Sequence, residues 1–95
     1  MEKVMNYSNL FITGYDKNNE WMLKWFLDNF TKHNETPILP FDFDDFQAPI
    51  GNASNWFKKP FAMIDASRNA ERVCWIDLDC HVQGCIDDIW DYVEP

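Results

Sequence analysis

Basic residues are scarce in this sequence: eight Lys and Arg stand against sixteen Asp and Glu, giving a formal net charge of −8. Binding to the phosphate backbone of nucleic acids depends on clustered Lys and Arg, so the composition argues against a nucleic-acid partner. The sequence also has no uninterrupted apolar run long enough to cross a bilayer. Its first six residues lack the apolar core of a signal peptide, and we expect a cytoplasmic protein without a transmembrane segment.

Cysteine and glycine are also few, with three of each. An odd number of Cys without framework spacing fits reduced thiols rather than a disulfide scaffold. No Gly/Ser-rich linker divides the chain, which predicts a single domain over residues 1–95. Aromatic residues are abundant by contrast, with five Trp and eight Phe. Either the core is unusually aromatic, or some of these side chains face a partner.

The order of apolar segments predicts an alternation of strands and helices. Strands are expected at residues 9–13, 36–41 and 73–76, the last of them buried on both faces. Helices are expected at residues 21–30, at residues 61–66 after Pro60, and at residues 85–93, the last preceded by a short strand or turn. This alternation implies a three-layer α/β/α domain with a mainly parallel sheet.

Parallel strands end at one edge of the sheet, and polar residues follow the first and third predicted strands. Along one crevice at that edge we expect Thr13, Tyr15, Asp16, Asp77 and Asp79. Side chains two apart on an extended segment point the same way, so Asp77 and Asp79 can face one hard cation while Leu78 points into the core. Such a cation keeps several waters and takes further ligands from the phosphates of a substrate.

The spacing Asp-x-Asp is weak evidence when taken alone. The sequence has eleven Asp and contains a second such triplet, Asp42-Phe43-Asp44. What distinguishes Asp77-Leu78-Asp79 is the apolar strand that leads into it. A polar strand end exposed to solvent is the alternative, and both interpretations stay open from the spacing alone. For Asp42 and Asp44, which follow a strand interrupted by proline, the solvent interpretation is preferred.

A zinc site would need more ligands than this sequence groups together. Cys80, His81 and Cys85 are close in sequence, but four ligands in metal-finger spacing are not present. We therefore expect buried or half-buried thiols. His81, which follows the carboxylates, stays a candidate contact for a ligand or metal.

Three segments together resemble glycosyltransferases of the GT-A fold. They are Trp56-Phe57-Lys58-Lys59-Pro60-Phe61-Ala62-Met63-Ile64-Asp65-Ala66, Val73-Cys74-Trp75-Ile76-Asp77-Leu78-Asp79-Cys80-His81-Val82 and Ile86-Asp87-Asp88-Ile89-Trp90. Enzymes with this fold have a Lys-Pro helix, an apolar strand ending in Asp-x-Asp, a short strand, and a helix with an acidic and apolar pattern. The resemblance covers most of the chain and implies a Rossmann-like, partial GT-A fold.

The resemblance also implies a function, the binding of a UDP- or GDP-sugar donor through Mn²⁺ or Mg²⁺. Asp79 is then the more direct metal ligand, and Asp77 contacts the ribose or reaches the metal through water. The base and ribose are lined by Thr13, Gly14, Tyr15 and Asp16. Lys59 either steadies the nucleotide and the carboxylates or is only an exposed charge before a helix. The metal neutralises charge on the departing nucleoside diphosphate while a hexosyl-type sugar passes to a glycan, lipid or protein acceptor.

Glycosyltransferases of this kind continue well beyond Asp-x-Asp to build the acceptor site. The resemblance therefore implies the N-terminal, donor-binding half of a longer enzyme. The sequence identifies no general base or nucleophile, so the catalytic residues and the stereochemical outcome are not assigned.

Two other functions fit parts of the sequence. Phosphatases of the haloacid-dehalogenase type also end an apolar strand in Asp-x-Asp, but 76 residues precede Asp77 here and no Gly-Thr follows Asp79. The other function is a non-catalytic module that forms a homo-oligomer or recruits a partner through exposed aromatic side chains. The candidates for that surface are Trp21, Trp25, Trp56 and Trp90.

Overall fold

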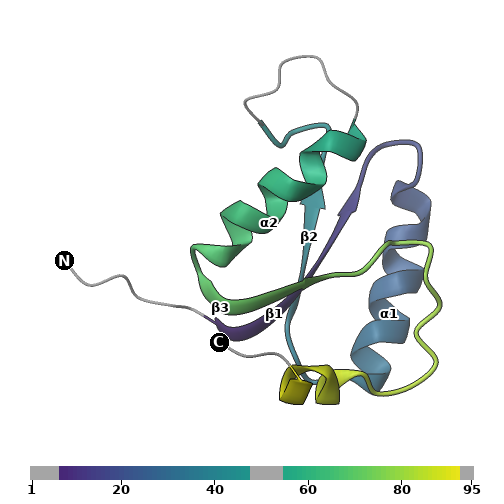
Figure 1. Cartoon of the computed structure of the whole chain (residues 1–95). Helices are drawn as coiled ribbons and strands as arrows, with labels where there is room; N and C mark the ends of the chain where they lie inside the picture. The colour runs from purple at the N-terminus through teal and green to yellow at the C-terminus, as the bar shows by residue number, and fades with distance from the viewer. Residues whose placement is uncertain (1–6, 48–54, 93–95) are drawn as a thin grey trace.

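The protein is a small α/β domain built on a three-stranded sheet in which all strands run parallel, as its computed structural model shows for residues 7–47 and 55–92 (Figure 1). The central strand is β1 (Tyr7–Tyr15), which lies between β2 (Ile38–Asp42) and β3 (Ala70–Trp75). In the register, Phe11 lies beside Ile38 on one side and beside Cys74 on the other. The sequence-based prediction of an α/β domain with a parallel sheet is confirmed.

Within residues 7–47 and 55–92, two α-helices and three short 3₁₀ segments connect and flank the strands. The α-helices are α1 (Leu23–His33) and α2 (Lys59–Ser67), and the 3₁₀ segments are η1 (Glu20–Met22), η2 (Asn55–Lys58) and η3 (Asp87–Tyr92). The helix expected at residues 21–30 is present as η1 followed by α1, and Phe26 and Phe30 on its inner face are fully buried. On its opposite face, Lys24 and Asp28 form an exposed ion pair of 2.7 Å one helical turn apart.

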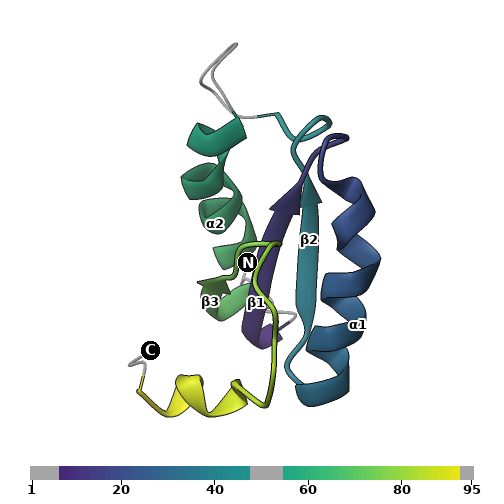
Figure 2. The same cartoon turned by 90° about the vertical axis from the view of Figure 1, so that its right-hand side faces the viewer.

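Alternate side chains of β1 enter two separate hydrophobic clusters. Phe11 packs with Phe26 and Phe30 of α1, whereas Leu10 and Ile12 pack with Ala66 of α2. Successive side chains of a strand point to opposite faces, so the two helices cover opposite faces of the sheet. Figure 2 shows this arrangement, with the strands between α1 and α2.

The third strand differs from the prediction. An apolar run at residues 73–76 predicted burial on both faces, but Val73, Cys74 and Trp75 are only half-buried. The reason is position, since β3 is an edge strand of the described sheet and has a neighbour on one side only. Apolar composition does not distinguish an edge strand from a central one.

The C-terminal segment also departs from the prediction. Residues 81–83 are neither helix nor strand, and the expected α-helix is the 3₁₀ segment η3. Hydrogen bonds tie this segment to the end of α1: the Asp87 carboxylate accepts from the backbone N–H groups of Glu35 (2.8 Å) and Thr36 (3.3 Å). The Trp90 indole lies 4.9 Å from the Phe11 ring and donates to Thr36 Oγ1.

The tryptophans that were predicted to form a partner surface differ in their exposure to solvent. Trp90 is only 8% exposed and packs in the hydrophobic cluster around Phe11 of β1. Its assignment to a partner surface is therefore wrong. Trp21 of η1 is 77% exposed, and Trp25 of α1 is 43% exposed. The side chain of Trp56 lies outside the described part of the structure. No helix among the described residues is long and apolar enough to span a bilayer.

Candidate functional site

A cleft of about 280 Å³ lies at the carboxyl ends of β1 and β3. Among the side chains and backbone that line it are five residues that the sequence analysis selected: Gly14, Asp16, Lys59, Asp77 and Asp79. They come from three separate parts of the chain. The fold therefore brings together the loop after β1, the start of α2 and the segment after β3.

The position of the cleft follows from the strand order β2-β1-β3. The chain leaves β1 to form β2 on one side of it, and then returns to form β3 on the other side. The connection from β1 to β2 passes over the α1 face and the connection from β2 to β3 over the α2 face, so the winding of the chain reverses between β1 and β3. In open parallel sheets this switch point is the place where a crevice opens for ligands.

Thr13 and Tyr15 do not line this cleft. Both share the α1 face of β1 with Phe11, whereas Gly14 lies on the other face of the strand and Asp16 follows its end. Thr13 is fully buried, and its Oγ1 has no hydrogen-bond partner among the described residues. Tyr15 packs against the hydrophobic cluster around Phe11. The strand predicted at residues 9–13 continues to Tyr15, so the pleat of β1 directs the side chains of Thr13 and Tyr15 away from the face of Gly14.

Asp77 is the centre of a small polar network in the cleft. Its Oδ1 accepts hydrogen bonds from Lys59 Nζ at 2.8 Å and from Trp75 Nε1 at 2.7 Å. The Lys59 ammonium also lies 5.3 Å from the centre of the Trp75 ring, within cation–π range. The hydrogen bond from Lys59, followed by that from Trp75, lowers the pKa of Asp77 below its ordinary value. Asp77 is therefore held as a carboxylate anion.

The segment Asp77-Leu78-Asp79 is a turn. The backbone N–H of Cys80 donates to the carbonyl of Asp77 at 3.1 Å, which closes a four-residue turn. The argument that both carboxylates point the same way along an extended segment is therefore wrong, although both line the cleft. Leu78 is 4% exposed and packs in the core, as predicted.

The carboxylates of the cleft suit a cation that shares its ligands with a phosphate. Within residues 7–47 and 55–92, no group of three or more His, Cys, Asp or Glu is placed to hold a metal ion. Mg²⁺ in nucleotide sites is bound by one or two carboxylates and takes its other ligands from waters and phosphates. Asp79 is exposed in the cleft beside Asp77, and oxygen ligands of this type match that chemistry.

The other metal candidates lie elsewhere. The His81 ring lies 5.6 Å from the Trp25 ring and is not among the residues that line the cleft. All three Cys are free thiols, and burial raises the pKa of Cys74. Cys80 and Cys85 are exposed, which corrects the expectation that they are buried or half-buried. Cys80 is the last residue of the turn that begins at Asp77, and the neighbouring Asp79 is exposed as well.

The sequence analysis missed an aromatic wall of the cleft. The rings of Phe43 and Trp75 stack with centroids 5.8 Å apart and an interplanar angle of 6°. They pass directly over Gly14, where a Cβ atom would lie 2.2 Å from Phe43 Cε2. A glycine at the end of the central strand was the available signal, because it allows close approach by another group.

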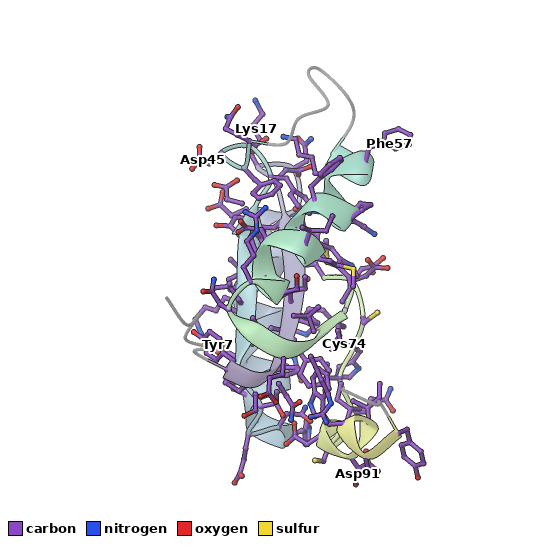
Figure 3. All side chains as sticks on the ribbon, turned by 60° about the vertical axis from the view of Figure 1, so that its left-hand side comes forward. Tyr7, Lys17, Asp45, Phe57, Cys74 and Asp91 are labelled. Atoms are coloured by element: carbon purple, nitrogen blue, oxygen red, sulfur yellow. The ribbon has the colours of Figure 1, made fainter. Side chains whose placement is uncertain are left out.

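Two loops at this end are fastened to each other by polar contacts. The backbone N–H of Lys17 donates to Asp44 Oδ2 at 2.8 Å, and Asp42 Oδ1 accepts from the backbone N–H of Asp44 at 3.0 Å. Lys58 Nζ donates to the carbonyl of Phe43, which fixes the aromatic wall. The second Asp-x-Asp triplet therefore shapes a loop. Figure 3 shows Lys17 and Asp45 at the same end of the domain, with Asp91 at the opposite end.

Comparisons test whether this arrangement belongs to a known group of proteins. Protein-family models, curated proteins and solved structures were each compared with the chain, and none of the three comparisons found a match. The geometry and charges of the cleft are therefore the basis for assigning a function.

Proposed function

We propose that the cleft binds a nucleotide-diphospho-sugar together with Mn²⁺ or Mg²⁺, and that the chain is the donor-binding part of a glycosyltransferase. In this proposal the domain is the three-layer, Rossmann-like portion of a GT-A fold. The observation that carries it is the position of Asp77 and Asp79 beside Asp16 at the β1/β3 switch point. Open parallel sheets bind nucleotides at such points.

The charges of the cleft support a requirement for a cation. Three carboxylates, those of Asp16, Asp77 and Asp79, line it together with the single ammonium of Lys59. A diphosphate entering alone would meet net negative charge, which is unfavourable in a partly desolvated site. A divalent cation bound by Asp79 neutralises this charge. When bound, the cation acts as a Lewis acid that stabilises charge on the leaving diphosphate.

The shape of the cleft suggests which part of the ligand it takes. Its volume of about 280 Å³ is close to the lower limit of small-molecule sites, about 300 Å³. This suits the diphosphate and the adjoining ribose. Asp16 lies on the β1 side of the cleft, where a carboxylate can accept hydrogen bonds from ribose hydroxyls. Thr13 and Tyr15 have no role in the proposal, since they face α1.

Calorimetry with UDP- and GDP-sugars tests the proposal. We expect binding in the presence of Mn²⁺ or Mg²⁺ and none in excess EDTA. Asp79→Asn should weaken binding at least about tenfold, or ~1.4 kcal/mol. The matched control is Asp45→Asn, which removes one exposed carboxylate at the same end of the domain but outside the cleft lining. Binding that is independent of metal, or equal effects of the two substitutions, would contradict the proposal.

A non-catalytic module is the second candidate, and one observation favours it. Trp21 is 77% exposed at the start of the first helix, and large aromatic side chains are enriched in protein interfaces. Light scattering after gel filtration tests this function. A stable oligomer that dissociates in Trp21→Ser, combined with no nucleotide-sugar binding, would favour the module. A monomer at high concentration would reject an oligomerising module.

A further inference from the structure

The two aspartates of the cleft have different surroundings. Oδ1 of Asp77 already accepts two hydrogen bonds, from Lys59 Nζ at 2.8 Å and from Trp75 Nε1 at 2.7 Å. Asp79 is exposed in the same cleft, and a tight turn separates the two side chains. Because their surroundings differ, the two aspartates do not have to act together as metal ligands.

The contacts of Asp77 hold the Lys59 ammonium in a defined place. Lys59 is the first residue of α2, and the following Pro60 restricts the backbone there. Its Nζ lies between the Asp77 carboxylate and the face of the Trp75 ring, 5.3 Å from the ring centre. Trp75 is fixed in turn by stacking on Phe43. The Lys59 side chain is 31% exposed and lines the cleft.

A cation on the same oxygen of Asp77 would conflict with this network. Mg²⁺ binds carboxylate oxygens at about 2.0–2.1 Å. It would then lie close to the Lys59 ammonium, which is 2.8 Å from that oxygen, and to the Trp75 N–H that points at it. Two positive groups at this distance repel each other, and one of them would have to leave.

We propose that Asp77 is a positioning residue: with Trp75 it holds Lys59 for direct contact with a phosphate oxygen of the ligand, while Asp79 is the carboxylate that binds the cation. An ammonium group has three N–H donors, so one group can bind Asp77 and a phosphate oxygen at the same time. The inference rests on the proposed function, because it assigns roles within the same cleft. The chemistry it names is a diphosphate bound by an ammonium group and a divalent cation together.

Two probes separate the roles, Mn²⁺ alone and pyrophosphate with saturating Mn²⁺. Paramagnetic broadening of backbone amide signals reports Mn²⁺ binding, and calorimetry reports pyrophosphate binding. Asp79→Asn should weaken Mn²⁺ binding at least about tenfold, whereas Asp77→Asn should change it by less than about twofold. For pyrophosphate, Asp77→Asn and Lys59→Met should each weaken binding about tenfold, and the double variant should be no weaker than either single variant.

Controls distinguish positioning from general damage. Lys17→Met removes one exposed ammonium at the same end of the domain, outside the cleft lining, and should leave pyrophosphate affinity unchanged. The indole N–H signal of Trp75 should shift in Asp77→Asn, while the remaining amide spectrum keeps its dispersion. This shift reports the loss of the hydrogen bond independently of any ligand.

Two results would overturn the inference. One is a loss of Mn²⁺ affinity in Asp77→Asn equal to that in Asp79→Asn, which would make both residues metal ligands. The other is a pyrophosphate affinity that is unchanged or raised in Asp77→Asn or in Lys59→Met. Failure of the proposed function is a separate result: Mn²⁺ and pyrophosphate would bind as described, but UDP- and GDP-sugars would not bind more tightly than pyrophosphate.

Discussion

Replacing Gly14 by Ala separates two physical effects that have opposite signs. Gly in a strand interior is less favourable than Ala by about 0.5–1 kcal/mol, because Gly loses more conformational freedom on folding. The φ angle of Gly14 is not in the left-handed region, so its backbone conformation is open to other residues. Backbone propensity alone therefore predicts that Gly14→Ala stabilises the domain.

Packing predicts the reverse. A Cβ atom at residue 14 would lie 2.2 Å from Cε2 and 2.4 Å from Cζ of Phe43, and 2.7 Å from Cη2 of Trp75. Carbon atoms meet favourably at about 3.5 Å or more, so Phe43 would have to move by roughly 1 Å. Phe43 is 5% exposed and stacked on Trp75, and it cannot move without disturbing that stack. Overpacking of this kind costs about 1–3 kcal/mol, which outweighs the backbone gain.

The expected net result is a loss of about 0.5–2 kcal/mol in the free energy of unfolding, measured by urea denaturation. Each kcal/mol corresponds to a fall in Tm of about 4–8 °C for a domain of this size. Phe43→Leu removes the ring that the new methyl group meets, so its effect and that of Gly14→Ala should not add. A Gly14→Ala variant at least as stable as the native chain, or additive losses in the double variant, would refute the packing argument.

Two further predictions concern stability away from the cleft. Burial works to raise the pKa of Asp87, but the hydrogen bonds from Glu35 and Thr36 lower it overall. Such a group stabilises the fold above its unfolded pKa of about 3.9 and loses this contribution as the pH falls. The difference in unfolding free energy between the native chain and Asp87→Asn, measured in urea, should therefore be larger at pH 6 than at pH 3, and equal differences would contradict this. Phe26→Ala should cost about 3–5 kcal/mol in the same assay, because Phe26 is fully buried. Trp21→Ala should change stability by less than about 0.5 kcal/mol, because Trp21 is mostly exposed; similar losses in both variants would contradict the assigned difference in burial.

Asp87 also explains why the C-terminal segment is ordered against α1 without an α-helix. The Asp87 carboxylate binds the chain just after α1, and Asn34 Oδ1 accepts from the backbone N–H of Ile86 at 2.6 Å. These polar contacts place Trp90 over Phe11 in the core. The apolar spacing at residues 86, 89, 90 and 93 is therefore confirmed only in part: Trp90 is buried and Ile86 packs against the core, but Ile89 is 38% exposed, and residue 93 lies outside the described residues.

Much of the fold follows from local sequence patterns. The apolar periodicity of residues 21–30 predicts the buried face of α1, because a helix repeats every 3.6 residues whatever it packs on. Phe26 and Phe30 are buried as that pattern requires, and the charged line through Lys24 and Asp28 is exposed. The alternation of strands and helices predicts a parallel sheet for a similar reason, since short connections limit how the elements can pair.

The cleft depends on the tertiary structure in three respects. Gly14 lines the cleft and Thr13 does not, because β1 continues to Tyr15 and successive side chains of a strand point to opposite faces of the sheet. The wall formed by Phe43 and Trp75 joins segments distant in sequence, which no local pattern records.

The third respect is the role of Asp77, for which the structure changes the interpretation of the sequence most. The sequence by itself determined that a carboxylate stands at the end of an apolar strand, and a metal ligand was the natural expectation. Only the tertiary structure brings Lys59 and Trp75 to its Oδ1, because α2 must first fold back across the sheet onto β3. Spacing along the chain identifies the residue, but the role of a charged group depends on the charges and donors that folding places around it.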